Sequence, residues 1–180
     1  LLEEADNQFR TLLGPHSDPE LRDRVWYYLT KISHQRGLHD KAYATLQRIE
    51  TPADKTLRAE LAILGANIRM ALGQNMEAAD SLKGVKAPEG WEEYLDINQG
   101  IALLRAGEIE KGRALLNSLG TTRTDNEELK ALRDRANLGL GYELLRAGDP
   151  QKAREFLSRV RLRGPFMQAA LLGAGWADGE

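Results

Sequence analysis

The sequence predicts an all-α protein, a solenoid of antiparallel helix pairs with about four repeats and a half repeat at each end. Three observations predict this fold. Glycines recur at similar intervals, small residues stand at fixed distances on both sides of each such glycine, and bulky apolar residues follow at helical spacing. Self-similarity of this kind is typical of helical-repeat proteins, in which each unit buries its apolar face against the next.

Four glycines mark the predicted turns between the two helices of each repeat. They stand 36, 34 and 41 residues apart: Gly37, Gly73, Gly107 and Gly148. Glycine suits the end of a helix because the chain there adopts a left-handed conformation that costs glycine little. Each of these residues therefore predicts one helix before it and a second helix after it.

A small residue stands seven positions before each glycine, and another stands five positions after it. The pairs are Thr30 and Ala42, Ala66 and Ala78, Gly100 and Gly112, and Gly141 and Ala153. Two helices that cross closely need small side chains at the crossing point, because larger ones hold the backbones apart. We therefore expect each pair to mark a helix crossing.

Bulky apolar residues follow in the second helix of each repeat. They stand four and seven positions after its small residue: Leu46 and Ile49, Leu82 and Val85, Leu116 and Leu119, Leu157 and Val160. These spacings place both residues on one helix face. We expect that face to be buried against the neighbouring repeat.

These landmarks divide the chain into repeats. The four full repeats cover residues 19–51, 52–87, 88–123 and 124–164. Residues 1–13 are expected to be the second helix of a preceding repeat, and residues 165–180 the first helix of a truncated one.

Capping signals predict where several helices begin. Three dipeptides place an N-cap residue before a proline: Asp18-Pro19, Thr51-Pro52 and Asp149-Pro150. Proline is favoured at the first helical position, where its missing N–H is not needed. Thr124 and Glu127 have the spacing of a capping box, which predicts a further start at Thr124.

The pattern as a whole resembles the tetratricopeptide repeat, which has two helices per about 34 residues. Trp26 and Pro165 stand where that family often carries tryptophan and proline, and residues 137–153 come closest to its consensus. Ser33 and Arg69 depart from it, since a large aromatic residue is usual there. The last interval is about seven residues longer than the consensus. We expect the extra length in the loop 120–126 or in the helix after it.

This resemblance implies a right-handed solenoid and a concave face, lined by the first helix of each repeat, that binds proteins. Carried over by register, the inner positions are Arg24, Tyr27, Lys31, His34, Glu60, Ile63, Asn67, Met70, Tyr94, Ile97, Ile101, Leu104, Arg135, Leu138, Tyr142 and Leu145, with Arg105 and Arg146 one position on. From these we select a partner-binding set: Tyr27, Lys31, His34, Asn67, Met70, Tyr94, Ile101, Leu104, Arg105, Tyr142 and Arg146.

The expected inner face is mostly apolar, with tyrosines along it, and such patches are typical of interaction sites. We expect the most exposed members to be Tyr27, Lys31, Asn67, Tyr94, Tyr142 and Arg146. The apolar residues either line an open groove or pack against the next repeat. A lysine–asparagine clamp for a terminal carboxylate, known in this family, is not expected, because Lys31 and Asn67 fall in different repeats.

Composition narrows the function classes. The 180 residues include 25 Lys and Arg against 27 Asp and Glu, a net charge of −2, whereas proteins that bind duplex nucleic acid usually carry a basic excess. Zero cysteines exclude disulfides and thiolate chemistry. No apolar run reaches the roughly 20 residues of a membrane span. We expect a soluble protein, of the cytoplasm or of a bacterial periplasm.

No catalytic constellation is visible, and we expect neither an enzyme nor a cofactor. The three histidines, His16, His34 and His39, lack the further ligands at set spacing that a zinc site needs, so no metal is expected. Four arginines near one predicted helix end are expected to be solvated: Arg154, Arg159, Arg161 and Arg163.

The leading functional hypothesis is a scaffold that binds a helical or extended protein segment on its concave face. One alternative is a structural or assembly subunit that packs through its ends, and another is a regulatory repeat region of a larger multidomain protein. Residues 169–176 have no polar face. A helix that is apolar all round is normally buried. We therefore expect either that the chain is a piece of a longer solenoid or that this helix self-associates with that of another copy, unless the helix is a frayed terminus.

Overall fold

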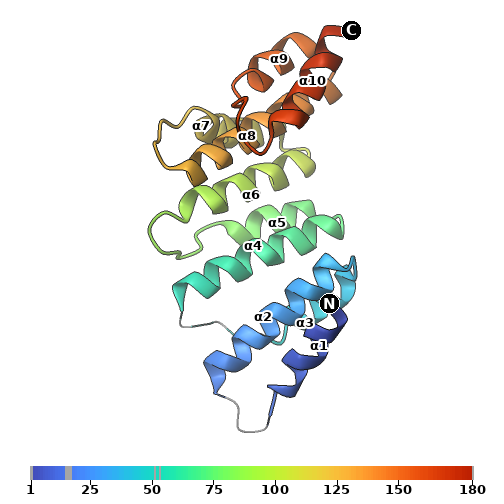
Figure 1. The fold of residues 1–180 in the computed structure, drawn as a ribbon, viewed down its shortest axis with the longest axis vertical. Helices are drawn as coiled ribbons and strands as arrows, with labels where there is room; N and C mark the ends of the chain where they lie inside the picture. Colours follow the sequence, from blue (N-terminus) through green and yellow to red (C-terminus); the bar gives the residue numbers. More distant parts are fainter. Residues whose placement is uncertain (1, 15–17, 51, 53, 180) are drawn as a thin grey trace. The chain divides into compact units, whose positions relative to one another are not determined.

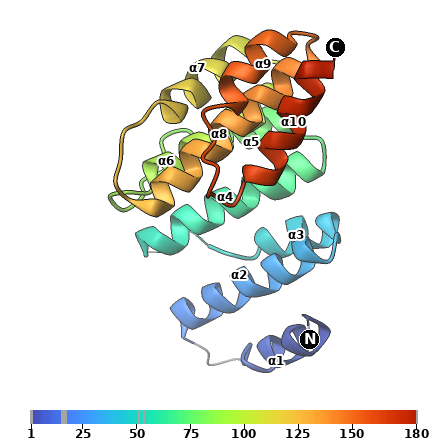
Figure 2. The ribbon, with the colours of Figure 1, turned by 45° about the horizontal axis from the view of Figure 1, so that its top comes forward.

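The computed structural model describes residues 2–14, 18–50, 52 and 54–179, and over these residues the chain forms ten α-helices and no strand (Figures 1 and 2). Helices contact mainly their neighbours in sequence or the next helix but one. The chain divides into two units, residues 1–91 and 92–180. The prediction of an all-helical array is confirmed at this level.

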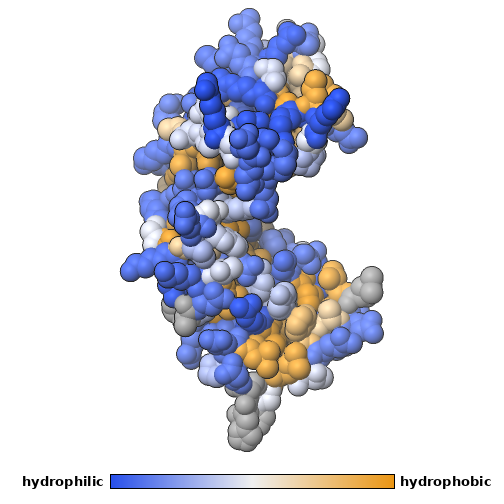
Figure 3. All heavy atoms as spheres, turned by 60° about the vertical axis from the view of Figure 1, so that its left-hand side comes forward, coloured by the Kyte–Doolittle hydropathy of each residue, from blue (hydrophilic) through white to orange (hydrophobic). Residues whose placement is uncertain are grey.

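The first unit contains five helices. They are α1 (Leu2–Thr11), α2 (Pro19–Gln35), α3 (His39–Leu46), α4 (Lys55–Ala71) and α5 (Asn75–Leu82). Helices α2 and α3 pack as one pair and α4 and α5 as another, while α1 packs on α2 through a stack of Phe9 on Tyr28 with ring centroids 5.1 Å apart. The core joins the two pairs through Tyr27, Ala42 and Ile68 among others. Figure 3 shows hydrophobic surface on this unit, where Leu12 and Leu21 are among the exposed side chains.

The second unit contains the other five helices. They are α6 (Glu92–Arg105), α7 (Ile109–Gly120), α8 (Glu127–Arg146), α9 (Pro150–Leu157) and α10 (Met167–Gly179). Helices α6 and α7 form one pair and α8 and α9 the next, and α10 packs on α8 and α9. One core cluster centres on Ile97, Leu116 and Leu140, and a second on Leu144 and Leu157. No helix of the described residues is both long and apolar enough to cross a membrane.

The four predicted glycine turns share one geometry. The φ angles of Gly37, Gly73, Gly107 and Gly148 are 75°, 79°, 85° and 75°. At the first turn the N–H of Gly37 donates to the carbonyl of His34, and the N–H of Leu38 donates to that of Ser33. The same two hydrogen bonds recur at the other three turns. They satisfy carbonyls that the end of a helix leaves open, and the predicted turns are confirmed.

The small residues lie at close helix crossings, as predicted. A Cβ atom added at Gly112 would lie 3.0 Å from the carbonyl oxygen of Gly100, so these two backbones nearly touch. A Cβ added at Gly141 would lie 3.4 Å from the carbonyl oxygen of Ala153. In the first unit the corresponding residues, Thr30, Ala42, Ala66 and Ala78, are fully buried.

Two of the predicted helix starts are confirmed. The Asp18 carboxylate accepts hydrogen bonds from the backbone N–H groups of Glu20 and Leu21, with Pro19 as the first residue of α2. The Asp149 carboxylate caps α9 in the same way, by accepting from the N–H of Lys152.

The other two predicted starts are wrong. Asp54 caps α4, so Pro52 precedes the helix, and Thr51 lies outside the described residues. Asn126 caps α8, because its Oδ1 accepts from the N–H groups of Glu128 and Leu129 at 2.8 and 3.2 Å. Thr124 instead accepts from the N–H of Asn126, which makes it part of the approach to the helix.

The extra length of the last interval, between Gly107 and Gly148, lies in two helices. Helix α7 has 12 residues where α3, α5 and α9 have eight, and α8 has 20 where α2 and α4 have 17. Fully buried Asn137 of α8 holds the longer α7 in place, because its Nδ2 donates to the carbonyl of Gly120 at 2.9 Å. The expectation of a longer helix after residue 126 is confirmed, and the added turn of α7 was not anticipated.

Candidate functional site

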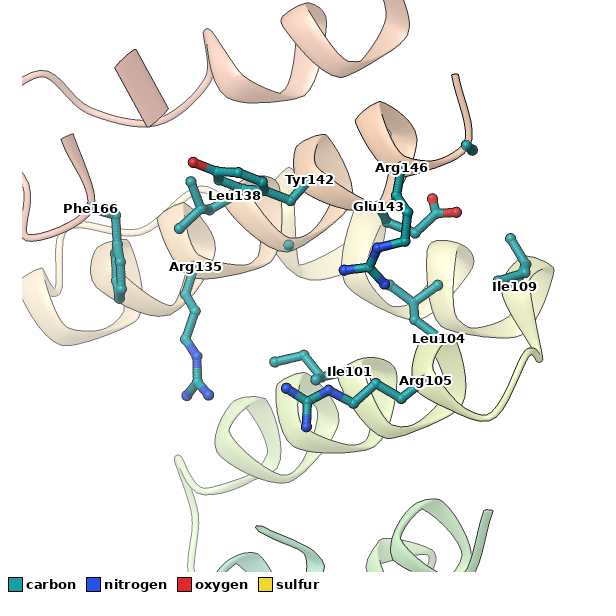
Figure 4. Close-up of a pocket in the computed structure, with 12 residues that line it drawn as sticks. Ile101, Leu104, Arg105, Ile109, Arg135, Leu138, Tyr142, Glu143, Arg146 and Phe166 are labelled. Atoms are coloured by element: carbon teal, nitrogen blue, oxygen red, sulfur yellow. The ribbon is translucent and has the colours of Figure 1, made fainter. Parts of the chain in front are cut away.

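A pocket of about 480 Å³ lies in the second unit between α6 and α8 (Figure 4). Both are first helices of their pairs, so the pocket lies on the face expected to bind partners. Its lining residues are Ile101, Leu104, Arg105, Ile109, Arg135, Leu138, Gly139, Tyr142, Glu143, Arg146, Ala147 and Phe166. Five members of the predicted set are therefore brought together here: Ile101, Leu104, Arg105, Tyr142 and Arg146.

Apolar side chains form most of the pocket wall. Ile101 and Leu104 come from α6, Leu138 from α8, and Phe166 from the segment before α10. All four are half-buried. Ile101 and Leu104 also pack on the core cluster around Ile97, and Leu138 packs on the cluster around Leu144. Ile101, Leu104 and Leu138 thus line the pocket and also pack on the core.

Three arginines surround this apolar wall. Arg105 and Arg146 are the last residues of α6 and α8, where a cation is favoured by the negative end of the helix dipole. Arg135 lies in the middle of α8 and is half-buried. Its pKa lies below the usual arginine value, chiefly because of burial and also because of the charge on Arg105. In Figure 4 the side chains of Arg105 and Arg135 extend into the space between the two helices.

The one carboxylate that lines the pocket is already engaged. Glu143 accepts two hydrogen bonds from Arg113 of α7, at 2.9 Å from Nε and 3.1 Å from Nη2. Such two-pronged pairing neutralises the carboxylate and fixes its direction. The remaining charge of the pocket is therefore positive.

Tyr142 has a structural contact as well as a place in the pocket wall. Its hydroxyl donates to the carbonyl oxygen of Ala169 at 2.9 Å, and its ring meets Trp176 edge to face with centroids 6.1 Å apart. Helix α10 is thereby fastened to α8. Tyr142 is half-buried, so the expectation that it is among the most exposed inner residues is wrong.

A second pocket, of about 220 Å³, lies in the first unit between α2 and α4. It brings together three members of the predicted set, Tyr27, Lys31 and Asn67, beside Glu60 and Trp91. Lys31 extends over the Tyr27 ring, with Nζ 5.7 Å from the centroid. Burial, followed by the charge of Glu60, raises the pKa of Tyr27 to about 12.

Several predicted inner residues belong to the core. Tyr27 is 7% exposed and packs on Leu57 and Ile68 of α4, so the expectation that it is exposed is wrong. Ile97 is fully buried against Leu116. Met70 is also buried. For Tyr27 and Ile97 the neighbouring helix covers the side chain.

The remaining members of the set have other contacts. Tyr94 hydrogen-bonds to Glu128, and burial followed by this bond raises the pKa of its phenol. His34 is half-buried in the last turn of α2, where its Nδ1 lies 3.1 Å from the Nδ1 of His39. Neither residue lines the pocket between α6 and α8. Among the described residues no group of three potential ligands could hold a metal ion, and His16 lies outside them.

The expectation that the four arginines near residue 160 are solvated holds for exposed Arg154, Arg159 and Arg163 and is wrong for Arg161. Arg161 pairs with buried Asp134 at 2.7 Å and with Glu127 at 2.6 Å. Arg154 pairs with Asp178, and Arg159 lies over the ring of Phe156. Arg163 is exposed, as expected.

Five lining residues were not among the predicted inner positions: Ile109, Gly139, Glu143, Ala147 and Phe166. Glu143 and Ile109 carry no sequence signal that points to the pocket. Phe166 directly follows Pro165, the first residue of the predicted truncated repeat, so its position at this junction was a usable signal.

Comparisons with protein-family models, with curated proteins and with solved structures gave no match. The fold and the site thus define the class as an all-α protein of sequentially packed helices with an apolar, arginine-lined pocket.

Proposed function

We propose that this chain is a scaffold of the tetratricopeptide type for protein–protein interaction, and that a segment of a partner protein docks between α6 and α8. One observation carries the proposal: half-buried apolar side chains from two successive first helices line a single open pocket. Grooves between helices are suited to an amphipathic segment, whose apolar face completes the burial. The four shared glycine turns and close crossings support the choice of repeat type.

The chemistry of the pocket favours binding over catalysis. Arginine remains protonated and so cannot act as a general base, and Glu143 is held by Arg113. The other lining groups are apolar apart from the Tyr142 hydroxyl, which donates to Ala169.

A display library of random peptides, selected on the purified chain, tests the proposal. Phe166→Ala removes one wall of the pocket, and Phe166 belongs to neither of the two core clusters described for the second unit. Leu162→Ala is its matched control in the same segment, where Leu162 is 68% exposed. Selected peptides should bind the parent and the control equally and bind Phe166→Ala at least about tenfold more weakly, as expected for the loss of an anchor. Equal binding to all three proteins, with unchanged circular dichroism, would place recognition elsewhere.

A second candidate function, assembly through the C-terminal helix, is favoured by the outer face of α10. Leu171, Leu172 and Trp176 are 55%, 53% and 55% exposed there. Exposed apolar residues of this size on one helix are typical of interfaces. Sedimentation equilibrium of the parent and of Leu172→Glu tests this function. A self-associating parent and a monomeric variant would support it, and a monomeric parent would contradict self-assembly.

A further inference from the structure

Some arginines of the second unit pair with a carboxylate of the same chain, and others do not. Arg113 pairs with Glu143, Arg161 with Asp134 and Glu127, and Arg154 with Asp178. The guanidinium groups of Arg135 and Arg146 form no ion pair and no hydrogen bond with the described residues. Both of these line the pocket.

Arg135 is the member of this group that needs an explanation. It lies in the middle of α8, so the helix dipole does not account for it. Its side chain is half-buried beside Leu138 and Phe166, and Arg105 repels it electrostatically. A cation taken partly out of water without a counter-charge is costly. An anion in the pocket would remove that cost.

The apolar wall indicates what kind of molecule carries the anion. A free phosphate or a nucleic-acid backbone would satisfy the arginines and leave Ile101, Leu138 and Phe166 uncovered. A protein segment with carboxylates beside apolar side chains would pair with the arginines and also cover the apolar wall. Arginine pairs with carboxylates through two parallel hydrogen bonds, which favours this choice.

From this arrangement, and resting on the proposed binding function, we infer that the occupant of the pocket is an acidic amphipathic helix of a partner protein. Its apolar face lies on Ile101, Leu138 and Phe166, and its carboxylates pair with Arg135 and Arg146. These two arginines are 11 residues apart on α8, about 16 Å at the helical rise of 1.5 Å per residue. A helix that runs alongside α8 therefore needs acidic residues about 11 positions apart.

Fluorescence anisotropy with designed peptides tests the inference. The probe is a labelled amphipathic helix with leucines at helical spacing on one face and glutamates 11 positions apart beside it. The probe is compared with two further peptides, one that carries glutamine in place of glutamate and one that carries lysine in place of glutamate. The glutamate peptide should bind the parent at least about tenfold more tightly than the glutamine peptide, because a hydrogen bond between charged groups stabilises the complex more than one to a neutral amide.

Variants of the protein locate the effect. Arg135→Glu should lose the preference for glutamate and gain one for the lysine peptide, and exposed Arg146→Glu should do the same at the other end. Arg163→Glu is the matched control, because Arg163 is exposed and lies outside the pocket, and its binding should equal that of the parent. Circular dichroism establishes that each variant is folded.

The outcomes separate this inference from the proposed function. If glutamine and glutamate peptides bind equally and Phe166→Ala weakens both, the groove binds proteins and the acidic occupant is wrong. If polyglutamate or inorganic phosphate displaces the probe as well as the unlabelled peptide does, the site is a simple anion site and the amphipathic helix is wrong. If neither the designed nor the library peptides bind, the proposed function fails together with the inference.

Discussion

Gly141 of α8 and Leu157 of α9 approach so closely that a Cβ atom at residue 141 would lie 2.5 Å from Cγ of Leu157. Leu157 is itself buried, so it has little room to move. The close approach exists because the two helices cross at small residues, and it fixes the position of α8 against α9. The pocket arginines of α8 depend on that position.

Gly141→Ala should therefore destabilise the protein by about 1–3 kcal/mol through overpacking. Gly139→Ala is the matched control two residues away on the same helix, where the nearest atom to an added Cβ is 3.9 Å distant. That change should be neutral or stabilising by up to about 1 kcal/mol, because alanine favours a helix. Urea unfolding of both variants compares their stabilities. Equal midpoints would contradict a close crossing of α8 and α9 at Gly141.

Asn137 should also contribute to stability, because it links α8 to α7. Asn137→Leu removes the donor to the carbonyl of Gly120 and leaves that buried oxygen without its bond, which costs about 1–3 kcal/mol. Asn117→Ala serves as the control, since Asn117 is exposed and its side chain accepts one hydrogen bond, from Arg159 at 3.3 Å. Urea midpoints should separate the two variants, and a midpoint of Asn137→Leu at the parent value would contradict this role.

The parts of the fold that the sequence could predict are local. A glycine with positive φ at Gly37 or Gly148, and a small residue at Gly112 or Gly141, are each required by the backbone within one helix pair. Spacing alone therefore places them. Capping was less predictable, because Asn126 and Thr124 can both accept from a first turn and only the path of the chain decides between them.

The candidate site was predictable in part. The register of the repeats placed Leu104, Arg105 and Arg146 on the inner face, where they line the pocket between α6 and α8. It could not distinguish them from Tyr27 and Ile97, which are buried, because burial depends on how the neighbouring helix packs. A pattern in the sequence does not show contacts between segments that are far apart in the chain.

The ion pair between Arg161 and Asp134 is one such distant contact, and its removal should be costly. Arg161→Met removes the closer of the two cations that pair with the fully buried Asp134 carboxylate and leaves only Arg133, at 3.6 Å. Breaking a buried pair costs about 3–5 kcal/mol. Adding Asp134→Asn should recover part of this loss, because the uncompensated charge is then gone. Thermal or urea unfolding of the single and double variants tests this. A double variant less stable than Arg161→Met would show that the pair acts through something other than charge.

The histidine pair at the first glycine turn predicts a dependence of stability on pH. Burial, and then the charge of His39, lower the pKa of His34 below its ordinary 6.5. The unfolded chain therefore binds a proton at a higher pH than the folded chain does. Stability contributed by neutral His34 is complete above the unfolded pKa and is lost as the pH falls below about 6.5.

His34→Gln should remove this part of the pH dependence while keeping a polar side chain at the turn. Urea midpoints at about pH 8 and pH 5 should then differ less for His34→Gln than for the parent, since an unshifted group adds nothing to the linkage. Carboxylates contribute equally to both proteins, so the difference between the two profiles isolates His34. Identical profiles would mean that the contact of 3.1 Å between His34 and His39 does not bias protonation in the folded chain.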